Sequence, residues 1–357
     1  MRAVIRRGDR LVVDNIAAPE PTAGNVLCKT LVCGICGSDL HALTHHEHMI
    51  AVAERLGSFT SMARGKDVVF GHEFCCEILD HGPSSDKTLK PGTRVVAVPG
   101  AMGPGGGFES VGYSNRYPGG FAEQIVVAER LLLEVPNGLA PEHAALTEPL
   151  AVGEHAVAMA DLKGNEVCLV IGCGPVGLAV IACLKARGAG PVIAADFSAV
   201  RRGHAEKMGA DIIVDPAEVS PHTQWADHGV PKTRGEAMLA TMAGRTVKKA
   251  VVFECVGVPG VIQNIAESAP AGTRMVVAGV CMEPDTFEPL ILVNKEVELR
   301  FVFAYNQAEF AASLRMLAEG KTNYANIVTE IVPLDATPDA FVKLQTDKSQ
   351  VKILVAP

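Results

Sequence analysis

The stretch Val-Cys-Leu-Val-Ile-Gly-Cys-Gly-Pro-Val-Gly, residues 167–177, decides the fold of half of this chain. Its apolar start predicts a buried strand, and the Gly-x-Gly-x-x-Gly pattern that follows opens a helical stretch. Gly172 permits the tight turn, Gly174 lets the backbone approach a pyrophosphate, and Gly177 allows the helix to pack closely on the strand. Because the helix N-terminus then faces the anion, this stretch predicts a dinucleotide-binding βαβ unit.

An acidic residue in the right place supports the same interpretation. The next apolar run, residues 192–195, ends at Asp196, about the 20 residues beyond the glycines at which a ribose-binding carboxylate is expected. That carboxylate would repel a 2′-phosphate, so we expect NAD rather than NADP, although Arg201 and Arg202 could hold such a phosphate. The residues that we assign to the cofactor site are Gly172, Gly174, Pro175, Val176, Gly177, Asp196, Arg201, Val256, Gly279 and Val280.

The sequence on either side of this unit indicates two domains, since 357 residues exceed the size of a single core. From residue 151 onward, apolar strands alternate with helical stretches, which is typical of a doubly wound parallel sheet. The first 150 residues instead contain short β-type runs separated by glycine and proline, which predicts a mostly antiparallel, barrel-like domain. These runs are residues 11–13, 26–28, 68–70, 94–98 and 124–127.

The end of the chain contains too few elements for a third domain. A charged segment at residues 294–296 leads into an apolar run, a helical stretch near 307–319 and a final strand at 351–355. We therefore expect an α/β protein in which residues 1–150 and 295–357 form a β-rich catalytic domain and residues 151–294 form the nucleotide-binding domain. The Gly- and Pro-rich residues 99–120 are expected to be a long loop.

Composition excludes several classes of function. A formal net charge of −8 without a Lys/Arg-rich run argues against a nucleic-acid partner. No stretch reaches the roughly 20 apolar residues of a spanning helix, and no signal-peptide core is visible, so we expect a cytoplasmic protein without membrane contact. Ten cysteines are few for a disulfide scaffold of this length. Cys33 and Cys36 have the spacing of a redox pair, but no thioredoxin-like pattern surrounds them.

The first domain also contains metal-ligating residue types. Cys36 and His41 begin and end the motif Cys-Gly-Ser-Asp-Leu-His, and His72 and Glu73 follow Gly71. Thiolate, imidazole and carboxylate are zinc ligands, and a catalytic zinc takes three protein ligands and keeps one position open. Each residue alone would have an ordinary structural role, but together with a nucleotide site they predict a catalytic zinc.

Four motifs, in order along nearly the whole chain, resemble the zinc-containing medium-chain alcohol and polyol dehydrogenases. They are residues 34–41, 71–73, 148–153 and 172–177. The Glu-Pro-Leu-Ala-Val-Gly motif at 148–153 resembles the sorbitol and threonine dehydrogenase branch. The resemblance implies a GroES-like catalytic domain, a Rossmann domain, one catalytic Zn²⁺ per subunit, and hydride transfer from an alcohol to NAD that gives a ketone or aldehyde. A secondary alcohol or polyol is the expected substrate.

The resemblance also implies roles for particular side chains. The zinc ligands would be Cys36 and His72, with Glu148 at the third position and Glu73 able to replace Glu148 or water. The other implied residues are Ser38 and His41, which would carry the alcohol proton, and Asp39, which would orient His72.

Two departures from the family pattern stand out. No cysteine occurs between residues 94 and 168, where relatives with a structural zinc carry four, so we expect that zinc to be missing. The segment 42–70 is longer than usual and includes His45, His46, His48 and a predicted helix at 49–56. The three histidines suggest a second metal, but we favour a lid or a subunit contact.

Two alternative functions and one assembly prediction remain. A zinc-free NADPH-dependent quinone or enone reductase would share the fold, and so would a non-catalytic nucleotide-binding protein. The apolar residues 289–293 are expected to pair across a two-fold axis and to give a homodimer or homotetramer.

Overall fold

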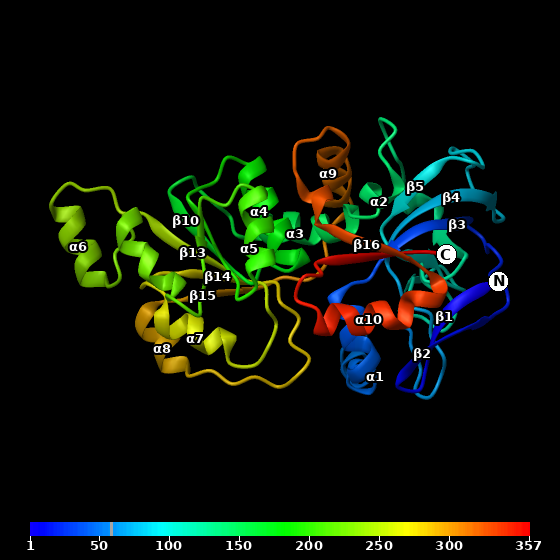
Figure 1. The fold of residues 1–357 in the computed structure, drawn as a ribbon, viewed down its shortest axis with the longest axis horizontal. Helices are drawn as coiled ribbons and strands as arrows, with labels where there is room; N and C mark the ends of the chain where they lie inside the picture. Colours follow the sequence, from blue (N-terminus) through cyan, green and yellow to red (C-terminus); the bar gives the residue numbers. More distant parts are fainter. Residues whose placement is uncertain (58–59) are drawn as a thin grey trace. The chain divides into compact units, whose positions relative to one another are not determined.

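The computed structural model describes residues 1–57 and 60–357, which fall into two units (Figure 1). The first unit combines Met1–Glu148, Phe310–Gly320 and Ala325–Pro357. The second consists of Pro149–Glu309 with Lys321–Tyr324. The second unit begins at residue 149, where residue 151 was expected, and the chain returns to the first unit after residue 309 and not after residue 294.

The last strand of the nucleotide-binding sheet accounts for this correction. Strand β15 (Glu298–Phe301) pairs in parallel with β14 (Arg274–Val277), so these residues belong to the second unit. The charged residues before it are no linker. Lys295 ends helix α8 (Pro289–Lys295) and donates hydrogen bonds to three carbonyls at the end of α7 (Val261–Ser268). Residues 289–293, which are expected to pair across a two-fold axis, lie in helix α8.

The sheet of the second unit has the order β12-β11-β10-β13-β14-β15, and all of its pairings are parallel. Its other strands are β12 (Ile212–Val214), β11 (Val192–Ala195), β10 (Glu166–Ile171) and β13 (Lys249–Glu254). Because helices cover both faces, these strands have apolar runs without alternation. From β10 the chain first adds β11 and β12 on one side and then β13, β14 and β15 on the other. The switch point therefore lies between β10 and β13, and open α/β sheets bind their ligands at such points. The predicted doubly wound fold is confirmed.

The helices of the second unit are α3 (Thr147–Met159), α4 (Pro175–Ala186), α5 (Ala199–Lys207), α6 (Arg234–Met242), α7 and α8. Helices cover the sheet from two sides, but α6 has no buried residue and lies apart from the strands (Figure 1). In Figure 1, α4 and α7 lie on opposite sides of the strands. On the α7 side, Trp225 from the 3₁₀ segment η2 (Pro221–His228) is buried in an apolar cluster with residues of β10, β11 and β13.

The first unit is built on a largely antiparallel sheet. Its order is β16-β17-β3-β4-β5-β9, with β8 also paired to β3. The strands are β3 (Asn25–Gly34), β4 (Glu73–His81), β5 (Arg94–Ala97), β8 (Gln124–Ala128), β9 (Leu132–Glu134), β16 (Val328–Pro333) and β17 (Lys352–Ala356). Two hairpins complete it: β1 (Arg2–Arg7) with β2 (Arg10–Asn15), and β6 (Gly100–Met102) with β7 (Phe108–Ser110).

Two local predictions for this unit were wrong. The run 68–70 forms only an isolated bridge, in which Val68 pairs with Arg6, and not a strand. The segment 99–120 is not a plain loop, because it contains the β6–β7 hairpin. The remaining helices of the unit are α1 (Gly37–Leu56), α2 (Pro141–Ala144), α9 (Gln307–Ala318), which starts in the second unit, and α10 (Thr337–Thr346).

Helix α1 is longer than the sequence predicted, since it starts directly after Cys36. Asp39 accepts a hydrogen bond from the Cys36 amide at 3.0 Å, and the left-handed Gly57 ends the helix. The buried face of α1 has helical spacing across the histidine-rich part as well. It consists of Ala42, His46, Met49, Ile50 and Ala53. Within the described residues, no helix combines the length and apolarity that crossing a bilayer requires.

Candidate active site

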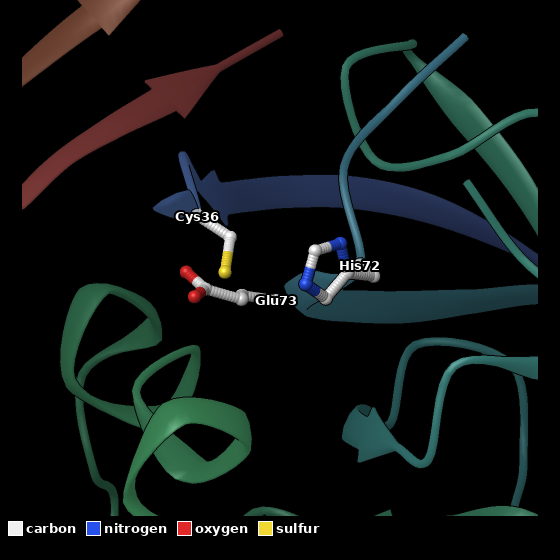
Figure 2. Close-up of side chains that lie close together, drawn as sticks. All are labelled: Cys36, His72 and Glu73. Carbon is white, nitrogen blue, oxygen red and sulfur yellow. The ribbon is translucent and has the colours of Figure 1, made fainter. Parts of the chain in front are cut away.

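Three ligand-type side chains converge where β3 ends and β4 begins. Cys36, His72 and Glu73 place their sulfur, nitrogen and oxygen atoms within 4.8 Å of one another (Figure 2). The antiparallel pairing of Gly34 with Glu73 brings the two chain segments together. A Cβ atom at position 34 would collide with Glu73 Oε2, so a larger residue there would displace the carboxylate. In the described parts of the chain, no other group of three His, Cys, Asp or Glu side chains comes this close.

His72 is oriented by a buried carboxylate. Its Nδ1 lies 3.4 Å from Oδ1 of Asp39, whose side chain is fully buried. This leaves Nε2 for a metal ion, which is the usual arrangement of a metal-binding histidine. Burial opposes the charged imidazole, but the negative charges of Asp39 and Cys36 outweigh it and raise the pKa of His72 well above its usual value.

A lysine that the sequence analysis missed completes the charge balance. Lys352 forms an ion pair with Glu73, and both side chains are only 1% exposed. Its Nζ also donates to the carbonyl of Ile35 at 3.0 Å. Burial alone would lower the pKa of Lys352, but Glu73 and then Cys36 outweigh it and raise the pKa, so the ammonium stays charged. The sequence signal that could have identified Lys352 is a single lysine in an otherwise apolar final strand.

The donor set fits a catalytic zinc. Thiolate, imidazole and carboxylate are three suitable protein ligands, and three is the number that leaves a coordination position open. Among the described residues, Glu73 Oε1 finds no hydrogen-bond partner although it is buried, as expected of an oxygen that has a metal to bind. Glu148, 8% exposed at the start of α3, lies outside this group, although its charge contributes to the raised pKa of Lys352.

The two residues expected to carry a proton both lie on α1. Ser38 Oγ is 2.9 Å from the hydroxyl of Tyr113, which the sequence analysis did not single out. His41 lies about one turn further along and is half-buried. Burial, assisted by His45, lowers the pKa of His41, so its imidazole is neutral near pH 7 and can accept a proton.

Cys33 and His46 are buried and have structural roles. Cys33 is fully buried, and burial raises the pKa of its thiol well above the usual value, which does not suit a redox pair with Cys36. His46 is also buried, with Nε2 2.7 Å from Nη1 of Arg6. The second-metal hypothesis therefore gains no support from the described residues, since no ligand group includes a histidine of segment 42–70.

The glycine loop has the geometry that dinucleotide binding requires. Gly172 has φ +88°, and a Cβ at Gly177 would collide with the Gly172 carbonyl oxygen. Gly174 is the N-cap of α4, and a Cβ added there would meet no atom within 4 Å. Open space in front of a helix N-terminus is what a pyrophosphate needs.

Asp196 follows the end of β11 and is fixed by the backbone. Its carboxylate accepts hydrogen bonds from the amides of Cys173 at 2.8 Å and Ser198 at 2.7 Å, which leaves lone pairs for ribose hydroxyls. Arg202 is engaged by Asp215 at 2.8 Å. Within the described residues, the buried Nε of Arg201 has no hydrogen-bond partner.

The remaining cofactor residues lie at the ends of the neighbouring strands. Val256, Gly279 and Val280 follow β13 and β14, at the same edge of the sheet as the glycine loop. Glu254, which sequence reasoning missed, is 2% exposed and accepts hydrogen bonds from the amides of Val256 and Gly257. Burial raises its pKa. This buried carboxyl group holds the loop that faces Gly172.

A Rossmann-type dinucleotide unit and a Cys/His/carboxylate centre define the class of a zinc- and nicotinamide-dependent dehydrogenase. Comparison with known proteins agrees. The family model described as zinc-binding dehydrogenase matches residues 175–319, and the one described as alcohol dehydrogenase GroES-like domain matches residues 22–137. The chain belongs to the zinc-binding alcohol dehydrogenase family.

Named relatives cover nearly the whole chain. (R,R)-butanediol dehydrogenase of Bacillus subtilis (strain 168) is 34% identical over 97% of this chain and 96% of its own length. Sorbitol dehydrogenase of Bos taurus is 31% identical over 93% of this chain and 89% of its own. The crystal structure of 2R,3R-butanediol dehydrogenase from Bacillus subtilis has a TM-score of 0.77 and 31% identity, covering 100% of this chain and 99% of that one.

These findings establish the general activity. The protein is a zinc-dependent oxidoreductase that transfers a hydride between an alcohol and a nicotinamide dinucleotide. The zinc-free reductase and the non-catalytic alternative are set aside, because the chain has both the ligand cluster and relatives that are dehydrogenases.

Proposed function

We propose that this protein oxidises the secondary hydroxyl of a vicinal diol or polyol to a ketone with NAD as the acceptor. The observation that carries the proposal is the Cys36, His72 and Glu73 cluster in a chain whose relatives act on butanediol and sorbitol. Asp196 supports NAD, because its fixed carboxylate would repel a 2′-phosphate and Arg202 is already occupied by Asp215.

Cys36, His72 and Glu73 would hold one zinc per subunit, with Glu148 as the alternative carboxylate. The metal supplies a Lewis acid that polarises the substrate oxygen. Around it, Asp39 orients His72 and Lys352 neutralises part of the buried charge on Glu73. The geometry favours Glu73 over Glu148 in the resting ligand set, which reverses the ranking expected from the resemblance.

The alcohol proton would leave through Ser38 and His41. Ser38 offers a hydroxyl on the first turn of α1, and the neutral imidazole of His41 can accept a proton near pH 7. Removing His41 should therefore slow oxidation most at lower pH, and small amine bases should partly restore the rate. A variant without a pH-dependent deficit would contradict the role of His41.

A cofactor and substrate screen tests the proposed function. We expect NADH formation with stereoisomers of butane-2,3-diol or with sorbitol, and slower reaction with primary alcohols of similar size. NADP should be the poorer acceptor. Activity with primary alcohols only, or a preference for NADP, would contradict the corresponding part of the proposal.

The second unit also supports a homodimer or homotetramer. Strand β15 is the terminal strand of the sheet, and on α8 beside it Leu290 and Val293 are 70% and 71% exposed. Edge strands and exposed apolar faces are typical sites of self-association. Light scattering should give a dimer or tetramer for the native chain and a smaller species for Leu290→Asp with Val293→Asp. A native monomer at working concentration would contradict the assembly.

The cysteines are consistent with a cytoplasmic location. All ten are unpaired, and disulfides are rare in reducing compartments. Fractionation of cells that express the full chain would test this location.

A further inference from the structure

Residues 60–67, which belong to the long segment 42–70 and follow α1, hold a distant part of the first unit in place. The carbonyl oxygen of Tyr113 accepts hydrogen bonds from the Ser61 amide and the Thr60 hydroxyl, both at 2.9 Å. Two residues later, Asn115 accepts from the Ala63 amide at 2.6 Å and donates to the Asp67 carbonyl at 2.7 Å. Residues 60–67 are therefore hydrogen-bonded to both Tyr113 and Asn115.

Residues 60–67 are also anchored to helix α1. Arg64 donates to Glu47 at 2.6 Å and to Glu54 at 2.9 Å, and both acceptors lie on α1. Helix α1 also carries Ser38 in its first turn. The residues that hold Tyr113 are therefore connected to the helix that bears Ser38.

The side chain of Tyr113 reaches the zinc centre. The centroid of its ring lies 5.2 Å from the ring centroid of His72 and 5.9 Å from that of Phe70. Its hydroxyl oxygen is 2.9 Å from Ser38 Oγ and 3.1 Å from Asp39 Oδ1. The phenol group of Tyr113 thus contacts both Ser38, in the proposed proton route, and Asp39, which orients His72.

We propose that Tyr113 is a positioning residue that holds Ser38 Oγ in one rotamer, and that residues 60–67 hold Tyr113 there. One hydrogen-bonding position of the Ser38 hydroxyl is occupied by Tyr113, so its remaining positions serve the substrate and the next group in the relay. This inference rests on the proposed role of Ser38 and adds a function for residues 60–67.

Tyr113→Phe tests the proposal, because it removes the hydroxyl and keeps the ring. We expect kcat for alcohol oxidation to fall about tenfold, the factor that corresponds to one net hydrogen bond. The KM for the dinucleotide and the zinc content should not change. Tyr117→Phe is the matched control, since Tyr117 lies four residues further along the chain and its hydroxyl donates to the Met102 carbonyl at 2.7 Å, away from Ser38.

A double-mutant cycle shows whether Tyr113 acts through Ser38. In a Ser38→Ala background, Tyr113→Phe should cause a smaller loss of kcat than in the native protein, because only its contact with Asp39 is then removed. Additive losses would overturn the proposal, and so would a Tyr113→Phe variant that behaves like Tyr117→Phe. Ser38→Ala with full kcat would overturn both this inference and the proposed proton route.

Hydrogen exchange provides a readout that does not depend on turnover. Asn115→Ala should speed exchange of the Ala63 and Ser61 amides, and Tyr113→Phe should speed exchange of the Cys36 amide, which Asp39 holds. Unchanged exchange in both variants would overturn the proposal. A different outcome is that the variants show these exchange effects while the zinc-loaded native protein oxidises no secondary alcohol. That outcome would contradict the proposed substrate and not the role of Tyr113.

Discussion

Replacing Lys352 with methionine should destabilise the first unit selectively. The substitution removes the cation from a pair in which both side chains are 1% exposed, and the Ile35 carbonyl loses its donor as well. Breaking a buried pair by deleting one partner typically costs about 3–5 kcal/mol, because the remaining charge is uncompensated. Lys352 pairs with Glu73 Oε2, and among the described residues Oε1 has no hydrogen-bond partner, so we expect a loss of about 4 kcal/mol in zinc-stripped protein.

The two-unit architecture supplies the assay and its internal control. Trp225 is the only tryptophan and is buried in the second unit, so the urea midpoint from its fluorescence should not change. Amide exchange of β3, β4 and β17 should report the loss in the first unit. Saturating zinc should reduce this loss of stability, since the metal ion then compensates the negative charge of Glu73.

A double variant separates charge from packing. Lys352→Met with Glu73→Leu removes both charges, and replacing a buried pair by apolar groups is often close to neutral. We therefore expect zinc-stripped double variant within about 1 kcal/mol of the native protein. A single variant that loses less than about 1 kcal/mol, or a double variant as unstable as the single one, would refute the assignment of a buried, charged pair.

Three further predictions concern the metal, the cofactor and pH. Cys36→Ser or His72→Ala should abolish turnover, while NADH binding, measured by fluorescence, should survive. The reason is that the zinc ligands and the glycine loop lie in different units. Near-normal turnover in either variant would contradict the zinc site. Asp196→Ala should lower the NAD over NADP ratio of kcat/KM by about tenfold, roughly the effect of one lost hydrogen bond, and an unchanged ratio would remove Asp196 as the selector. Burial, followed by Lys295, lowers the pKa of His222 to about 4. Since the unfolded chain takes up this proton near pH 6.5, stability of the second unit should be full above that pH and fall by about 1.4 kcal/mol per unit towards pH 4. His222→Gln should flatten the pH dependence of the Trp225 urea midpoint, and an identical slope in both proteins would contradict the buried neutral imidazole.

The parts of the site that could be predicted depend on chemistry local in the sequence. The glycine loop needs only a strand, three glycines at fixed spacing and an acid one strand later, all within about 30 residues of a βαβ unit. Cys36 and His72 were identified by motifs that resemble a known family. In both cases the residue type and its immediate neighbours carry the information.

The parts that could not be predicted depend on pairing between distant segments. Lys352 reaches Glu73 only because β17 pairs with β3, and nothing in the final strand names its partner. The boundary of the second unit was misplaced for a similar reason, since a charged segment that caps a helix looks like a linker in sequence. Tyr113 went unnoticed because one tyrosine in a glycine-rich stretch has no pattern.

The two missed side chains show how the zinc centre is completed by elements far apart in the chain. Motif residues supply the ligands, but a ligand set that is buried and rich in negative charge needs a cation and fixed orientations around it. β17 supplies the cation as Lys352, and the segment gripped by residues 60–67 supplies Tyr113, which contacts Ser38 and Asp39. If this division holds, Lys352 variants should chiefly alter stability and metal retention, whereas Tyr113→Phe should chiefly alter kcat. A Tyr113→Phe protein that loses zinc as readily as Lys352→Met would show that both residues serve the metal alone, and Ser38 would then need another explanation for its fixed position.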